Sequence, residues 1–154
     1  MANKFFPLFV DLSEKRILVV GGGKIGTRRI NTLLSFSDCI TVVDPSPSES
    51  VKKLFETGRI RLLRESFREE TISDADIVLS CTDNQEINQK IYQACKRLGI
   101  PVNIASDKSM CDFYFPGIAK NGNIVIGITA SGMDHHQAKM VRQRIENVLN
   151  EEEK

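Results

Sequence analysis

The chain has 154 residues, of which 41% are apolar and 27% charged, and 21 basic against 20 acidic side chains leave a net charge of +1. This length suits one globular domain and leaves no room for a cofactor domain beside a separate substrate domain. The balanced charge argues against an electrostatic nucleic-acid binder. No apolar stretch approaches the roughly 20 residues that cross a bilayer, and the N-terminal segment lacks a signal-peptide pattern.

Four cysteines are spread along the chain and form no C-x-x-C pair: Cys39, Cys81, Cys95 and Cys111. Scattered cysteines in a chain of this size are typical of reduced, mostly buried thiols in a cytoplasm. We therefore expect a soluble, cytoplasmic protein that binds neither nucleic acid nor membrane.

Short β-branched segments alternate with longer helical patterns along the first two thirds of the chain. The predicted strands cover 16–20, 39–43, 60–63, 77–80 and 101–104. The predicted helices cover 24–35, Pro47 to about Thr57, and 84–98. Parallel strands need crossover helices, so this order predicts an α/β fold with a Rossmann-like, doubly wound parallel sheet and helices on both faces.

The last third of the chain has a different pattern. Two apolar segments, 113–116 and 124–128, flank Asn121-Gly122, a dipeptide typical of β-hairpin turns. A C-terminal helix follows, with Ala138, Val141, Ile145 and Val148 on one face. We expect one NAD-binding domain over 1–150, made of a Rossmann core (about 1–108), a β-hairpin segment (109–132) and a C-terminal helix (133–150), with a frayed tail at 151–154.

The segment from Gly21 to Gly26 has the pattern G-x-G-x-x-G directly between a predicted strand and a predicted helix. This context is the one that a dinucleotide-binding turn requires. Gly21 permits the tight turn, Gly23 lets a pyrophosphate approach the backbone, and Gly26 lets helix and strand pack closely. We expect cofactor contacts from Gly21, Gly22, Gly23, Lys24, Ile25, Gly26, Asp44, Pro45, Thr82 and Asp83.

Asp44 follows the second predicted strand. An acidic side chain there accepts hydrogen bonds from both ribose hydroxyls and repels a 2′-phosphate, so NAD is favoured over NADP. Lys24 and the pair Arg28-Arg29 are nearby cations that partly offset this repulsion. The arginine pair fits either a solvated helix face or contacts to substrate carboxylates.

Thr82 and Asp83 follow the fourth predicted strand. The carboxyl ends of strands line the ligand crevice of an open α/β sheet, so both are candidates for contacts to cofactor or substrate. The alternative is that Asp83 or Asn84 only caps the next helix.

Several motifs together resemble one known family. They are Phe6-Pro7-Leu8-Phe9, the Val19–Lys24 turn, Thr82-Asp83, the block Cys111-Asp112-Phe113-Tyr114-Phe115-Pro116, and Ser131-Gly132. Their order resembles the precorrin-2 dehydrogenase domain of sirohaem synthases over nearly the whole chain. The glycine pattern is generic, whereas the F-P-L-F start and the C-D-F-x-F-P block are much more specific.

The resemblance implies NAD-dependent dehydrogenation of precorrin-2 to sirohydrochlorin in sirohaem biosynthesis, with a tetrapyrrole substrate and a nearby base that accepts a proton. Some members of the family also insert iron, so the resemblance leaves a ferrochelatase step open. Two other interpretations remain. One is a non-catalytic NAD-binding sensor domain, and the other is a tetrapyrrole-binding or metal-delivery protein.

The chain departs from the family after the fifth predicted strand. The family has an aspartate, proposed as its acid/base group, where this chain has Ser106, and Asp107 follows one position later. An aspartate can serve as a base, whereas an unassisted serine cannot. We expect the catalytic residues among Asp107 and Ser106: Asp107 acts as the base, or Ser106 positions substrate, or the pair only forms a turn or cap.

A second departure follows Ser131-Gly132, where the family's G-K-S-P motif is lost and His135 and His136 appear. Adjacent helical residues point about 100° apart, so we expect exposed residues and no metal site. Family members continue into a helical extension that helps to dimerise and covers the substrate. Since this chain ends at Lys154, we expect a homodimer or a partner that supplies those helices.

Overall fold

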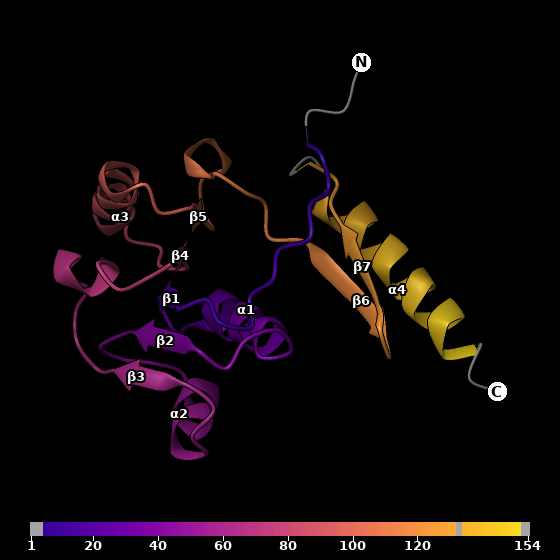
Figure 1. Cartoon of the computed structure of the whole chain (residues 1–154), viewed down its shortest axis with the longest axis horizontal. Helices are drawn as coiled ribbons and strands as arrows, with labels where there is room; N and C mark the ends of the chain where they lie inside the picture. The colour runs from indigo at the N-terminus through magenta and orange to yellow at the C-terminus, as the bar shows by residue number, and fades with distance from the viewer. Residues whose placement is uncertain (1–4, 132–133, 152–154) are drawn as a thin grey trace. The chain divides into compact units, whose positions relative to one another are not determined.

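The computed structural model describes residues 5–131 and 134–151. The chain forms two compact units. One unit is Val10–Phe113, and the other combines Met1–Phe9 with Tyr114–Lys154 (Figure 1).

The first unit is built on a parallel sheet. Its strands are β1 (Ile17–Val20), β2 (Ile40–Val43), β3 (Arg61–Leu63), β4 (Ile77–Ser80) and β5 (Val102–Ile104). They lie in the order β3-β2-β1-β4-β5, and every pairing is parallel (Figure 1). The chain first steps outward from β1 to β3 and then returns to build the other half beside β1. This order is that of a Rossmann-like, doubly wound sheet and confirms the predicted fold class.

Three α-helices and a short 3-10 helix connect these strands: α1 (Lys24–Leu33), α2 (Glu49–Glu56), η1 (Glu69–Ile72) and α3 (Gln85–Leu98). The prediction that Pro47 opens α2 is wrong by two residues. The hydroxyl of Ser48 accepts a hydrogen bond from the N–H of Val51 at 3.3 Å, so Ser48 is the N-cap and the helix begins at Glu49. At the other end of α3, Gly99 has a φ of 69°, a conformation that stops a helix as predicted.

One part of the core lies where α3 and η1 cover the sheet. All four residues of β1 are buried, which explains the continuous apolar run of that strand. On the α3 side, apolar side chains from the strands pack with those of the helix: Leu18, Val20, Val43, Val78, Val102, Ile91, Ala94 and Cys95. This packing gives the carboxyl ends of the strands a rigid support.

The second unit pairs a hairpin with a helix. Its elements are β6 (Gly117–Asn121), β7 (Ile124–Ile128) and α4 (His135–Glu151). The strands are antiparallel and Asn121 pairs with Ile124, so the loop is Gly122-Asn123, one residue later than predicted. The predicted first arm, 113–116, is also wrong, because the strand begins only after Pro116. Pro116 cannot donate a main-chain hydrogen bond to a neighbouring strand, because proline has no N–H.

The four cysteines are free thiols. Cys95 is buried and Cys81 and Cys111 are half-buried, whereas Cys39 is exposed in the loop before β2. The expectation of mostly buried thiols is therefore wrong for Cys39. Within the described part of the chain, no helix has both the length and the apolar character needed to span a membrane.

Candidate functional site

The predicted cofactor and catalytic residues gather at one edge of the first unit's sheet. The glycine turn follows β1, Asp44 follows β2, Thr82 follows β4 and Ser106 follows β5. Val20 at the end of β1 pairs with Ser80 at the end of β4. The direction of winding reverses between these two strands, and ligands of open α/β sheets bind at such a point.

Two glycines of the turn sit where no side chain fits. Gly21 has a φ of 99°, and a Cβ there would lie 2.8 Å from the main-chain carbon of Cys81. A Cβ on Gly26 would lie 1.9 Å from the carbonyl oxygen of Gly21. Both glycines therefore allow β1, α1 and the end of β4 to approach more closely than any other residue permits.

Gly23 differs from these two glycines because space is open around it. A Cβ there would meet no atom within 4 Å. Gly23 is also the N-cap of α1, and no side chain caps this helix, whereas Ser48 caps α2 and Asn84 caps α3. The first-turn N–H groups of α1 are thus left for an anion in front of the turn, which suits a pyrophosphate. Lys24 and Ile25 are exposed beside it.

The carboxylate of Asp44 fastens the glycine turn to the loop after β2. Its Oδ2 accepts a hydrogen bond from the N–H of Gly22 at 2.5 Å, and its Oδ1 accepts one from the N–H of Ser46 at 2.7 Å. A carboxylate has about four acceptor positions, so two remain for ribose hydroxyls. Pro45 is exposed next to it. Asp44 can therefore hold the turn and contact a ribose at once.

Thr27 and Ser48 form a second link across the turn that sequence reasoning missed. Their hydroxyl oxygens are 2.9 Å apart, and the N–H of Ser48 donates to the carbonyl of Gly22 at 3.0 Å. The N-cap preference of serine was the one available signal for Ser48. The contact to Thr27 depends on tertiary structure.

The structure distinguishes the roles of the polar residues that follow β4. Asn84 is the cap of α3, since its Oδ1 accepts from the N–H of Ile87 at 3.0 Å. The hydroxyl of Thr82 accepts from the N–H of Asn84, also at 3.0 Å. Asp83 is exposed, and its carboxylate has no hydrogen bond or ion pair with the described residues. The capping alternative therefore applies to Asn84, and Asp83 stays available to a ligand.

A buried amide connects the ends of β4 and β5. The hydroxyl of Ser80 donates to Oδ1 of Asn88 at 2.6 Å, and Nδ2 of Asn88 donates to the hydroxyl oxygen of Ser106 at 3.1 Å. Asn88 is only 1% exposed. Sequence reasoning missed it, although a polar residue beside the apolar face of a helix (Ile87, Ile91) was a usable signal.

Asp107 is the carboxylate nearest in sequence to Ser106. Its Oδ1 accepts from the hydroxyl of Ser109 at 2.6 Å and from the N–H of Ser109 at 2.8 Å, and it caps the 3-10 helix η2 (Lys108–Met110). The Ser109 hydroxyl, followed by the Ser109 N–H, lowers the pKa of Asp107 below its ordinary value. The group is therefore ionised at neutral pH, as a proton acceptor must be.

The two arginines of α1 have different surroundings. Nη1 of Arg29 donates to Oδ1 of the buried Asn103 at 2.5 Å, and Nδ2 of Asn103 donates to the carbonyl of Phe113 at 2.7 Å. Arg28 is exposed. Arg29 thus joins α1 to β5, and the solvated-face interpretation applies to Arg28.

Comparison with known proteins places this geometry in a family. The sequence model of a family described as "Putative NAD(P)-binding" matches residues 8–117. The chain belongs to this family. The match covers the whole first unit, Val10–Phe113, and it begins within the F-P-L-F motif.

Two relatives are named for siroheme synthesis. The chain is 33% identical over 144 residues to a siroheme synthase of Psychrobacter cryohalolentis, covering 94% of this chain and 28% of that protein. It is 36% identical over 144 residues to a multifunctional siroheme biosynthesis protein of Ruminiclostridium josui, covering 93% of this chain and 28% of that protein. The chain thus spans less than a third of the length of these relatives.

The structure also resembles a solved precorrin-2 dehydrogenase, SirC. The TM-score is 0.82 with 26% identity, over 93% of this chain and 70% of SirC. The family membership and this likeness agree on a Rossmann-like fold, followed here by the predicted hairpin and C-terminal helix.

The described residues hold no group of three or more His, Cys, Asp and Glu side chains that would suit a metal ion. His136 is exposed near the start of α4. The side chain of His135, as well as Gly132, lies outside the described part of the chain.

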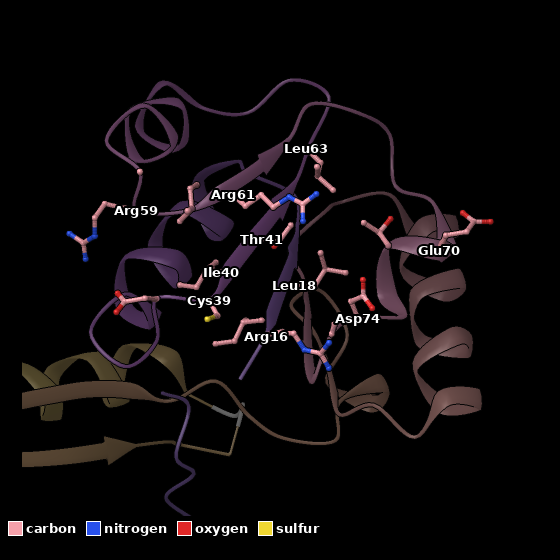
Figure 2. Close-up of a pocket in the computed structure, with 16 residues that line it drawn as sticks. Arg16, Leu18, Cys39, Ile40, Thr41, Arg59, Arg61, Leu63, Glu70 and Asp74 are labelled. Atoms are coloured by element: carbon pink, nitrogen blue, oxygen red, sulfur yellow. The ribbon is translucent and has the colours of Figure 1, made fainter. Parts of the chain in front are cut away.

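A hollow of about 740 Å³ lies away from the glycine turn, at the strand starts of β1, β2 and β3. Figure 2 shows Leu18, Thr41 and Leu63 along it, with Arg59 and Asp74 toward its margins. The hollow exists because the connection from β3 to β4 contains only the short helix η1. Part of the sheet face beside η1 is therefore left uncovered. None of the predicted cofactor residues lines it.

Proposed function

We propose that this chain is an NAD-dependent precorrin-2 dehydrogenase, which forms sirohydrochlorin in sirohaem biosynthesis. The likeness to SirC carries the proposal, because it covers 93% of this chain. The first unit alone, Val10–Phe113, is only about two thirds of the chain. A likeness confined to dinucleotide binding would end there.

The glycine turn fits a dinucleotide. The open space at Gly23 and the uncapped start of α1 leave room and N–H groups for a pyrophosphate. Asp44 has acceptor positions for the ribose hydroxyls, and its charge disfavours a 2′-phosphate, so we assign NAD rather than NADP. Bound NAD would supply the hydride acceptor of the reaction.

The chain's own residues supply binding and proton transfer. Oxidation of the macrocycle removes a hydride and a proton, and the proton needs an acceptor at the carboxyl edge of the sheet. Asp107, ionised and located just after β5, is our candidate for this base. Thr82 and Asp83 are candidates for contacts to cofactor or substrate at the same edge.

We further propose that two copies of the chain associate through the second unit. Its described surface includes large apolar side chains that are strongly exposed: Phe6, Leu8, Phe9, Ile124 and Val148. Phe6, for example, is 87% exposed. Large apolar side chains exposed in this way favour association with another molecule. Sedimentation velocity should find a dimer for the unaltered chain and a monomer for Phe6→Ser/Leu8→Ser; a monomeric unaltered chain would favour a different partner.

The free cysteines support a reducing compartment, and we place the enzyme in the cytoplasm. This assignment predicts that the protein purifies with four titratable thiols after unfolding.

The decisive experiment is anaerobic incubation of the full chain with precorrin-2 and NAD, followed by the absorption of sirohydrochlorin. We expect product with NAD, much less with NADP, and none without a cofactor. NAD binding without product would instead support a sensor. Addition of ferrous iron to the product tests a ferrochelatase step, and a sirohaem spectrum would assign that step to the chain.

A further inference from the structure

The hydrogen bonds around Asn88 have only one possible direction. The carbonyl oxygen of Thr82 can only accept, and it lies 3.1 Å from Nδ2 of Asn88. The amide must therefore present its NH₂ group to Thr82 and its oxygen to Ser80. The second hydrogen of Nδ2 then points to Ser106, which is 3.1 Å away.

This direction determines what Ser106 can do. Its hydroxyl oxygen already accepts from Asn88, and an amide cannot take a proton from it. The hydroxyl hydrogen of Ser106 has no acceptor among the residues that the structure describes, and Ser106 is exposed. Ser106 is therefore a hydrogen-bond donor at the carboxyl end of β5 rather than a base.

Asn88 is held in place from three sides. Ser80 is fully buried and donates to its oxygen, Thr82 accepts from its nitrogen, and its own main chain belongs to α3. A buried amide with all these partners has one stable rotamer. The orientation of Ser106 is consequently set by the core of the first unit and not by solvent.

We propose that Asn88 is a positioning residue, which directs the Ser106 hydroxyl to donate a hydrogen bond to a carboxylate of the bound tetrapyrrole. The inference rests on the proposed function for the identity of the ligand. It assigns Ser106 to substrate orientation and leaves proton transfer to Asp107. The substrate is rich in carboxylate side arms, which are acceptors without donors at neutral pH.

The test measures binding as well as turnover. Sirohydrochlorin, titrated into the full chain and followed by its absorption, gives a Kd that needs no catalysis; kcat and KM for precorrin-2 are measured at saturating NAD. Ser106→Ala removes the donor, and we expect Kd and KM to rise about tenfold or more, as for other hydrogen bonds to charged groups, with kcat and NAD affinity within about twofold. Ser106→Thr keeps the hydroxyl and should restore binding.

Asn88→Asp replaces the NH₂ group by an acceptor of nearly equal size. The Ser106 hydroxyl would then donate to the new carboxylate, so Kd and KM should rise as in Ser106→Ala. The double variant should be no worse than either single variant, because both remove the same interaction. Gln89→Glu makes the same chemical change on the next, exposed residue of α3 and should leave these values unaltered.

The outcomes separate the two proposals. Absence of turnover with sirohydrochlorin binding intact would refute the proposed function while the Kd values still test Asn88. If Ser106→Ala leaves Kd unchanged, or if the two single variants add, the inference fails. Should Asn88→Asp not fold, Ser80→Ala loosens the same amide; a rise in Kd that disappears in the Ser106→Ala background supports the inference, and an unchanged Kd overturns it.

Discussion

A Cβ on Gly26 would lie only 1.9 Å from the carbonyl oxygen of Gly21. One turn of chain therefore closes on itself at the end of β1, and the two glycines are needed for folding as well as for binding. A Cβ on Gly23, by contrast, would meet no atom within 4 Å. Glycine is therefore needed at this position for the approach of a ligand and not for packing.

This difference predicts two separable variants. Gly26→Ala should lower the free energy of unfolding by about 1–3 kcal/mol, as overpacking typically does. Gly23→Ala should leave the unfolding midpoint nearly unchanged, because its φ of −78° suits alanine, yet weaken NAD binding at least tenfold (~1.4 kcal/mol) by obstructing the pyrophosphate. Urea unfolding and NAD titration measure the two effects. Full NAD affinity in Gly23→Ala would contradict the assigned phosphate site.

Asp44 should determine the choice of nucleotide. Asp44→Ala removes the acceptors for the ribose hydroxyls and the charge that opposes a 2′-phosphate, so NAD affinity should fall about tenfold while NADP affinity rises or stays level. Ser46→Ala is the control, since Ser46 contacts Asp44 through its main-chain N–H. Equal affinity of the unaltered protein for NAD and NADP would argue against this role.

The sequence predicted the sheet and the glycine turn because both depend on local patterns. The buried strands are continuous apolar runs, and the turn needs glycines at fixed spacing between a strand and a helix. The start of α2 was predicted less accurately, since the helix begins at Glu49, after its Ser48 cap, and not at Pro47. The first hairpin strand was misplaced because Phe113–Pro116 is apolar without being paired.

The parts of the site that sequence reasoning missed depend on contacts between distant residues. Ser80, Asn88 and Ser106 belong to a strand, a helix and a loop, and only the fold brings them together. Arg29 and Asn103 are likewise far apart in sequence. Such polar pairs have no periodicity, so a single sequence does not reveal them.

Asp76 should make stability depend on pH in the acid range. Nε and Nη2 of Arg16 each donate to its carboxylate at 3.1 Å, and the Arg16 side chain, followed by the Arg16 N–H, lowers the pKa of Asp76 from 3.8 to about 2. Because the folded-state pKa is the lower one, this stabilisation is present above pH 4 and disappears as the pH falls toward 2.

Asp76→Asn should therefore be less stable than the unaltered protein at pH 7, and the difference should shrink as the pH approaches 2. Urea unfolding between pH 7 and pH 3 measures it. Asp38→Asn removes an exposed carboxylate with no ion pair to the described residues and should show no such trend. A difference that stays constant with pH would show that charge is not the cause.

Cys39 should be the fastest thiol to react with an aromatic disulfide reagent in the folded protein, because it is exposed. Cys95 should react only on unfolding, since it is buried and burial raises its pKa to about 12. Mass spectrometry after timed labelling measures the order, and early labelling of Cys95 would indicate local opening of α3.

Ser109 should adjust the pH at which the enzyme turns over. If ionised Asp107 accepts the proton, kcat falls as the pH drops through the pKa of Asp107. The Ser109 hydroxyl is the main cause of the lowered pKa, so Ser109→Ala should raise this pKa and move the acid limb of the kcat profile to higher pH.

Asp107→Asn should lower kcat about 100-fold or more with NAD affinity unchanged. Ser73→Ala, which removes an exposed hydroxyl bonded to the carbonyl of Glu70, is the control for loss of a serine. An unshifted profile in Ser109→Ala with an active Asp107→Asn would leave Asp107 as the cap of η2 alone.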